Sequence, residues 1–212
     1  EWDSKIGAFF GKSVADFLAK FQIEKLDFVA SHGHTIFHQP EKGFTVQVGH
    51  GADLAAQSGH VVICDFRSKD VAMGGNGAPL VPIGDRLLFP NYKFCLNLGG
   101  FANISFQNQH TIIAFDIVAA NIVLNFYAQK LGIAYDEEGK LAASGKVNLQ
   151  ILNELNSLPF YKKEYPKSLG KEWVMAEIFP ILEKYSLLEG DILASYCEHI
   201  AIQISKVVLE NS

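Results

Sequence analysis

The stretch KFCLNLGGFANISFQNQHTIIAFDIVAANIVLN, residues 93–125, decides the fold that the sequence predicts. It contains three apolar segments rich in β-branched and aromatic side chains, at residues 94–98, 102–106 and 111–115. The pair Gly99-Gly100 separates the first two segments, and the polar residues 107–110 separate the second two. This spacing is typical of consecutive antiparallel strands joined by tight turns.

Asp116 follows the third segment, and the small residues Ala119 and Ala120 lead on to an apolar helical run. A carboxylate at the end of a strand, just before a helix, is where α/β proteins place their chemistry. The same position suits a residue that only caps the N-terminus of the helix. Both interpretations stay open at this point, and the local sequence by itself favours the cap.

The composition is that of an ordinary globular protein. Of the 212 residues, 49% are hydrophobic and 19% are charged, and the net charge is −5. No basic stripe offers a footprint for a phosphate backbone, so we expect no nucleic-acid partner. No apolar run reaches the length of about 18 residues that a membrane-spanning helix needs, so we expect no membrane association. The first four residues do not resemble a signal peptide.

The three cysteines, Cys64, Cys95 and Cys197, are odd in number, widely spaced and set in apolar segments. We expect buried free thiols in a reducing compartment, and neither a disulfide framework nor a zinc site. The predicted localisation is therefore the cytoplasm.

Before the opening stretch, the periodicity predicts helices that alternate with short strands. The helices are expected at residues 4–22 and 52–57, and the strands at residues 26–30, 44–48 and 61–64. A polar, glycine-rich loop, residues 65–79, follows, and ordered loops of such length are usually functional. A boundary near Pro90-Asn91 would divide the chain into domains at residues 1–90 and 91–212.

Beyond Asp116 the chain is predicted to be mostly helical. The helices are expected at residues 121–131, 148–156, 171–185 and 191–209. Pro180 must end or kink the third of them. Strands first and helices later predict an α/β protein with helices packed on a sheet.

Glycine-rich motifs give no decisive signal. Residues 139–147 superficially resemble a P-loop but have one residue too many between the glycines, and valine stands where the magnesium-binding hydroxyl belongs. Gly74-Gly75-Asn76-Gly77 lacks the G-x-G-x-x-G pattern. In the turn Gly99-Gly100, backbone N–H groups could approach an anion closely, although a plain hairpin needs the same residues.

Histidines gather at His32, His34 and His38, but their spacing is not a strong metal signature. Neither cysteine nor a paired carboxylate completes it, so we expect a polar loop that faces a ligand and no metal-binding residues.

The carboxylates Asp65 and Asp70 alternate with the cations Arg67 and Lys69 in the 65–79 loop. This mixture suits a small polar or anionic ligand such as a sugar acid. The alternative is a surface loop held together by its own salt bridges.

A series of motifs covers nearly the whole chain: Ser31-His32-Gly33-His34-Thr35, 44–49, Asp65-Phe66-Arg67, Asp70-Val71-Ala72, 74–82, 96–104, Phe115-Asp116, 143–148 and 166–172. In residues and order, these motifs resemble those of the anhydro-N-acetylmuramic acid kinase family. The resemblance implies an α/β, two-domain fold of the sugar-kinase, Hsp70 and actin type, which is RNase H-like. It also implies a cytoplasmic kinase of peptidoglycan recycling, which opens the 1,6-anhydro ring of anhydro-N-acetylmuramic acid with water and phosphorylates O6.

The resemblance assigns roles to particular residues. The family's general base is the aspartate of a Phe-Asp-x-x-x-x-Asn motif, which falls on Asp116, and Gly99-Gly100 falls on a phosphate-contacting hairpin. The residues expected to bind the sugar are Arg67, Asp70, His32 and Asn121. ATP and Mg²⁺ are the implied cofactors, the amino sugar and ATP are the partners, and a homodimer is compatible with the resemblance.

This sequence also departs from the family pattern. Val118-Ala119-Ala120 stands where the family usually has Gly-Pro-Gly, and His34 and Asn76 replace glutamines. The family's N-terminal Ser-Gly-Thr-Ser-x-Asp-Gly hairpin and its C-terminal Gly-Gly-Gly adenosine segment do not occur. We therefore expect an incomplete fold, without three strands of the first domain and without the C-terminal part of the second. Such a piece could be inactive alone, and the alternatives are a non-catalytic sugar-binding remnant or an actin-like ATPase relative.

Overall fold

The computed structural model describes residues 1–39, 42–108 and 111–212, which form a mixed α/β chain with small sheets. The chain divides into two compact units, Glu1–Leu80 and Val81–Ser212. Pro90, near which the sequence predicts a boundary, lies within the second unit. The predicted turn residues Gln109 and His110 are outside the described residues.

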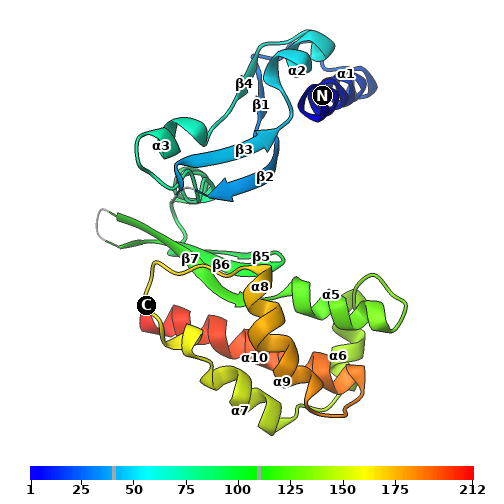
Figure 1. Ribbon diagram of the computed structural model, residues 1–212, viewed down its shortest axis with the longest axis vertical. Coiled ribbons are helices and arrows are strands. Elements are labelled where there is room, and N and C mark those ends of the chain that lie inside the picture. The colour runs from blue at the N-terminus through cyan, green and yellow to red at the C-terminus, as the bar shows by residue number, and fades with distance from the viewer. Residues whose placement is uncertain (40–41, 109–110) are drawn as a thin grey trace. The chain divides into compact units, whose positions relative to one another are not determined.

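Unit 1 begins with helix α1 (Trp2–Phe21), which packs on helix α2 (Gly51–Ser58), as Figure 1 shows. The helices predicted at residues 4–22 and 52–57 are therefore confirmed. The close approach depends on Gly7 and Gly11, one helical turn apart, because a Cβ at either would collide with the backbone of His50 or Leu54.

The strands of unit 1 form two separate two-stranded sheets. Strand β1 (Val29–Ser31) pairs in parallel with β4 (Val62–Cys64), and β2 (His34–Gln39) pairs antiparallel with β3 (Phe44–Val48). The sequence places the first strand too early and misses β2, which is polar and gains its hydrogen bonds from pairing with β3. Helix α3 (Ser68–Ala72) likewise interrupts the predicted 65–79 loop.

Unit 2 contains the sheet that the opening stretch predicts. Strands β5 (Phe94–Leu98), β6 (Phe101–Asn108) and β7 (Thr111–Ala119) are antiparallel in the order β5-β6-β7. Strands β6 and β7 are longer than predicted, and β7 continues past Asp116. The hairpin prediction is therefore confirmed, while the predicted end of the third strand is wrong.

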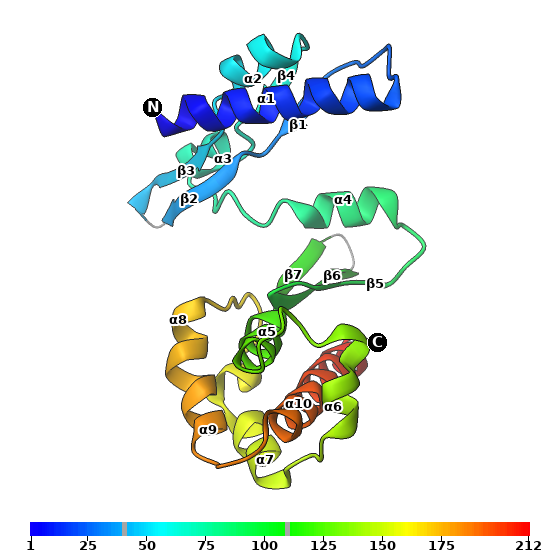
Figure 2. The ribbon, with the colours of Figure 1, turned by 90° about the vertical axis from the view of Figure 1, so that its right-hand side faces the viewer.

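In Figure 2, the sheet of unit 2 lies between helix α4 (Val81–Leu88) on one side and the remaining helices on the other. Those helices are α5 (Asn121–Lys130), α6 (Lys140–Ser144), α7 (Leu149–Ser157), α8 (Lys171–Trp173), α9 (Phe179–Glu183) and α10 (Glu189–Glu210). Short helical turns accompany them: η2 (Glu137–Gly139), η3 (Pro159–Lys162) and the π-helical η4 (Val174–Ile178). Pro180 does not end the predicted helix, because α8, η4 and α9 follow one another without a gap; the regular α-helix is instead replaced by the π-helical turn η4 just before Phe179 and Pro180.

The core of unit 2 forms between the sheet and these helices. Ile104 and Ile117 from the strands meet Leu155, Leu182 and Leu193 from the helices, and all five side chains are buried. The hydroxyl of Tyr196 donates to the carbonyl of Ala119 over 3.0 Å, which ties α10 to the end of β7.

Helix α10 is long and apolar enough to span a membrane by length and composition, which the sequence analysis did not foresee. It is the one such helix among the residues that the structure describes. Its buried side chains, including Ile192, Leu193 and Tyr196, belong to the core of unit 2. The apolar side chains of α10 are therefore explained by its packing in the core of unit 2.

Candidate functional site

Asp116 lies inside strand β7, next to a β-bulge. Asn103 pairs with Asp116 and Ala102 pairs with Val118, so Ile117 is an extra residue on β7. Bulges of this kind are common beside active sites, where they re-aim a side chain. The interpretation of Asp116 as a helix cap is wrong, because α5 begins at Asn121, its N-cap residue is Ala120, and no side chain caps it.

The carboxylate of Asp116 is half-buried and held on one side. The N–H of Leu169 donates to its Oδ2 over 2.8 Å, and the Asp116 N–H donates to the carbonyl of Lys167 over 3.1 Å. Burial raises the pKa of the Asp116 carboxyl above its usual value, and the Leu169 hydrogen bond opposes that rise. A carboxylate with a raised pKa is a stronger base than an exposed one, which suits proton abstraction near neutral pH.

The glycine turn is tied to the start of helix α5. The Gly100 carbonyl accepts from the N–H groups of Ala120 and Ile122, over 2.8 and 3.2 Å. The Asn121 side chain donates to the carbonyl of Leu98 over 3.0 Å, and its backbone N–H donates to Gly99 over 3.2 Å. The hairpin tip and the helix start, which both carry predicted site residues, are therefore adjacent in unit 2.

The glycines of this turn are not required by backbone strain. Neither Gly99 nor Gly100 has a positive φ. A Cβ at Gly99 would make only ordinary contacts, and a Cβ at Gly100 would meet no protein atom within 4 Å. Side chains would therefore fit at both positions, and Gly100 faces open space.

In unit 1, the predicted residues His32, Arg67 and Asp70 belong to one hydrogen-bond network centred on Gly77. Arg67 donates from Nε to His32 Nε2 over 2.7 Å and from Nη1 to the Gly77 carbonyl over 2.8 Å. The N–H of Gly77 donates to Asp70 Oδ2 over 2.6 Å. Because His32 Nε2 accepts, the ring proton lies on Nδ1, which is 3.1 Å from the Gly33 carbonyl.

This network replaces the salt bridges that were the alternative for the 65–79 loop. The ion pairs found among the described residues do not include Arg67, Lys69 or Asp70. Instead, the side chains of Arg67 and Asp70 bind the backbone of Gly77, so hydrogen bonds between side chains and main chain close the loop.

The seven predicted site residues divide between the two units, and in unit 2 hydrogen bonds join Asn121 to the glycine turn and Asp116 to Lys167 and Leu169. His32, Arg67 and Asp70 lie in unit 1, and Gly99, Gly100, Asp116 and Asn121 lie in unit 2. Lys167 and Leu169 were not predicted as site residues, although both lie in the family-like motif at residues 166–172. No local signal identifies them, because their backbone atoms contact Asp116, which lies 53 positions before Leu169.

The cysteines differ from the prediction of buried thiols. Cys64 is exposed, and Cys95 and Cys197 are only partly buried. In the described ranges 1–39, 42–108 and 111–212, no group of three or more histidine, cysteine or acidic side chains could hold a metal ion.

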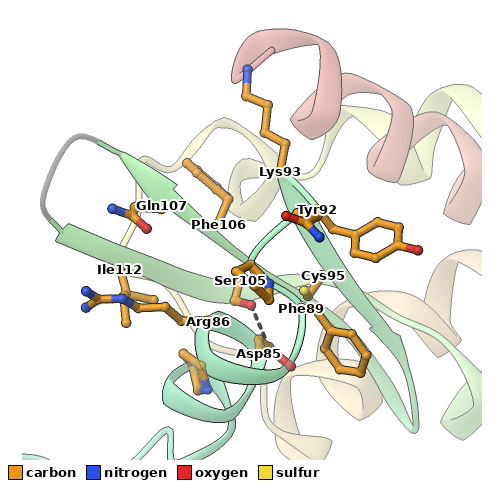
Figure 3. Close-up of a pocket in the computed structure, with 13 residues that line it drawn as sticks. Asp85, Arg86, Phe89, Tyr92, Lys93, Cys95, Ser105, Phe106, Gln107 and Ile112 are labelled. Carbon is orange, nitrogen blue, oxygen red and sulfur yellow. Dashed lines mark hydrogen bonds between the residues drawn. The ribbon is translucent and has the colours of Figure 1, made fainter.

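A cavity of about 440 Å³ lies in unit 2 between α4 and the sheet (Figure 3). The buried Ser105 hydroxyl donates to Asp85 Oδ2 over 2.6 Å and fastens α4 to β6. Burial and the charge of Asp85 raise the pKa of the nearby Cys95 thiol. Asp85 is not among the predicted site residues, and none of those residues lines this cavity.

Comparison with known proteins identifies the family. A model described as anhydro-N-acetylmuramic acid kinase matches residues 1–212. Proteins of that name from Shewanella sp. (strain ANA-3) and Shewanella amazonensis are 37% and 39% identical over 222 and 225 residues. Each alignment covers 97% of this chain and 60% of the relative. The chain belongs to the anhydro-N-acetylmuramic acid kinase family and spans about three fifths of the length of the curated relatives it matches.

Proposed function

We propose that this chain forms part of an ATP-dependent kinase that opens the 1,6-anhydro ring of anhydro-N-acetylmuramic acid and phosphorylates O6. The observation that carries the proposal is the half-buried Asp116, with a raised pKa, beside a β-bulge in a chain of this family. The reaction would serve peptidoglycan recycling in the cytoplasm.

Asp116 is the proposed general base. It takes a proton from water while the water oxygen bonds to the anomeric carbon of the sugar. The bond from that carbon to O6 breaks and O6 bonds to the γ-phosphorus. The bond between that phosphorus and the bridging oxygen breaks, and ADP leaves with that oxygen and the electron pair. General-base assistance of this kind contributes about 10²–10⁴ in rate.

The Gly99-Gly100 turn is the proposed contact for the phosphates of ATP. The open space at Gly100 supports this role, because phosphate oxygens bind best where a backbone comes close without side chains. Mg²⁺ would neutralise phosphate charge. It typically binds through substrate phosphates and one or two carboxylates, so it does not need the three-residue cluster that the described ranges lack.

The network around Gly77 is the proposed sugar-recognition element of unit 1, and Asn121 is proposed by itself as a sugar contact of unit 2. Arg67 uses Nε and Nη1 within the chain and has no partner for Nη2 among the described residues. A guanidinium held in this way presents its remaining donors in a fixed direction. The carboxylate that muramic acid carries on its lactyl group is a suitable acceptor.

The finer fold assignment is part of this proposal. We infer the two-domain architecture of sugar kinases, Hsp70 and actin, with domains at residues 1–90 and 91–212. Family membership and the antiparallel hairpins before the helices of unit 2 support this assignment. A homodimer is the proposed assembly, and size-exclusion chromatography with light scattering would test it.

Calorimetric titration tests the proposal first. The 212-residue chain is titrated separately with anhydro-N-acetylmuramic acid and with Mg²⁺–ATP. Turnover is then measured in the chain and in a chimaera in which these residues replace the matching part of the Shewanella amazonensis relative. We expect turnover in the chimaera and its loss, by about 10²–10⁴, in Asp116→Asn. Sugar binding without turnover in the chimaera would instead support a non-catalytic binding module.

A further inference from the structure

The segment at residues 165–169 lies along the outer edge of β7 and contacts Asp116 twice. Its Lys167 carbonyl accepts from the Asp116 N–H over 3.1 Å, and its Leu169 N–H donates to Asp116 Oδ2 over 2.8 Å. The first contact satisfies the open edge of the strand. Covering the edge does not require the second contact, which fixes the side chain.

Aromatic contacts hold the same segment against the residue next to Asp116. The ring of Tyr165 stacks on Phe115 with centroids 5.3 Å apart and planes at 11°, and it meets Phe106 edge-on at 6.3 Å. The ammonium of Lys167 lies 5.6 Å from the Phe115 ring and 5.0 Å from the Phe160 ring. The segment is therefore anchored independently of its contacts with Asp116.

The side chain of Leu169 adds a further anchor, because it packs partly buried against the core of unit 2. The Leu169 N–H is held relative to β7 by the anchored segment as a whole, of which this packing is one part. An aspartate carboxylate otherwise rotates over a broad range about its last torsion. A donor fixed at Oδ2 limits that rotation and sets the plane of the carboxylate.

The other oxygen, Oδ1, accepts no hydrogen bond from the described residues. Among these residues, the one buried side-chain polar atom without a partner is the Tyr127 hydroxyl, so Oδ1 is not fully buried. The arrangement holds one carboxylate oxygen and leaves the other for an incoming water.

We propose that Leu169 is a positioning residue for Asp116, whose backbone N–H orients the carboxylate so that Oδ1 receives the proton of the attacking water. The catalytic part of this inference rests on the proposed function. The geometric part, that the N–H holds the carboxylate, does not.

The decisive change replaces Leu169 by its α-hydroxy acid through stop-codon suppression, which substitutes an ester oxygen for the N–H alone. The matched control is Leu169→Ala, which keeps the N–H and loses the packing. In the chimaera we expect the ester to lower kcat about 10–100-fold, as for loss of a hydrogen bond to a charged group. The KM for the sugar should change by less than about twofold, because substrate binding does not use this bond.

The pH profile separates positioning from a general structural effect. Burial and the Leu169 N–H are the two causes of the shift in the pKa of Asp116, and no charged side chain among the described residues adds to it. Because the N–H lowers the pKa, the ester should raise it and move the acid limb of kcat to higher pH. Leu169→Ala should leave that limb in place. An unmoved limb in the ester variant, or an equal movement in both variants, would overturn the proposal.

A titration without turnover distinguishes this proposal from the proposed function. The carboxyl carbon of ¹³C-labelled Asp116 is followed by NMR in the 212-residue chain, with Asp116→Asn to assign the signal. An ester that leaves this titration unchanged rejects the positioning role even if Asp116→Asn abolishes turnover. A raised pKa together with full turnover in Asp116→Asn keeps the Leu169 contact and rejects Asp116 as the base.

Discussion

Units 1 and 2 both contain strands and helices, but they bury their apolar side chains to different extents. In the described part of unit 1, Leu54 and Val71 are the buried hydrophobic residues, and Phe9 on α1 is 66% exposed. In unit 2, a continuous core joins the three-stranded sheet to its helices. Two-stranded sheets cannot enclose a core, so a helix with an apolar face does not by itself guarantee burial. The two units should therefore differ in how they respond to substitution.

The largest effect is expected in the core of unit 2. Leu155→Ala should lower the free energy of unfolding of this unit by about 2–5 kcal/mol, because Leu155 is fully buried on α7. Leu149→Ala is the matched control, since Leu149 is exposed on the same helix. Urea unfolding is followed by Trp173 fluorescence in a Trp2→Phe background. Equal losses in the two variants would contradict the packing described for α7.

A smaller, local effect is expected in unit 1 from Asp70→Ala. The Asp70 carboxylate accepts from the Gly77 N–H, and hydrogen bonds to charged groups contribute about 1.5–3 kcal/mol. Hydrogen exchange at the Gly77 amide should become about 10–100-fold faster, with little change in the amides of α10. Asp70→Asn keeps an acceptor and should have a weaker effect. Unchanged exchange at Gly77 would show that the backbone alone closes the loop.

A pH-dependent effect is expected from the buried His199 of α10. Its ring bonds to Asn156 Oδ1 over 2.7 Å and to the Tyr161 hydroxyl over 2.9 Å, and burial lowers its pKa to about 3. Between pH 6.5 and 3 the unfolded state carries the proton and the folded state does not. This difference should lower the stability of unit 2 by about 1.4 kcal/mol per pH unit as the pH falls.

The variant His199→Gln tests the origin of that slope. It should be less stable than the parent at neutral pH but lose less stability on acidification, as measured by urea unfolding at several pH values. A slope equal to that of the parent would assign the acid sensitivity to other groups.

The smallest effect is expected from Phe9→Ala in unit 1, within about 0.5 kcal/mol, because substitutions at exposed positions rarely cost more. Hydrogen exchange along α1 provides the measurement, with Leu54→Ala as the buried counterpart on α2. A loss at Phe9 as large as that at Leu155 would remove the distinction between the two units.

The sequence predicted the local elements well where one pattern dominated. The strand at Phe94–Leu98, the turn at Gly99-Gly100 and most helices were found, because alternation, glycine pairs and helical periodicity are local signals. Strand β2 was missed because its hydrogen bonds depend on pairing with β3. The local sequence favoured a helix cap at Asp116. Strand β7 continues past this residue, and its bulge there depends on how β7 pairs with β6.

The sequence by itself determined the family, the order of the motifs and the identity of the candidate base, since these depend on residue types and their order along the chain. Tertiary structure alone decided what surrounds that base. The burial that raises the pKa of Asp116 and the N–H of Leu169 that opposes the rise both come from chain segments distant in sequence. The same is true of the Gly77 network, because hydrogen bonds depend on distances between atoms that the sequence does not specify.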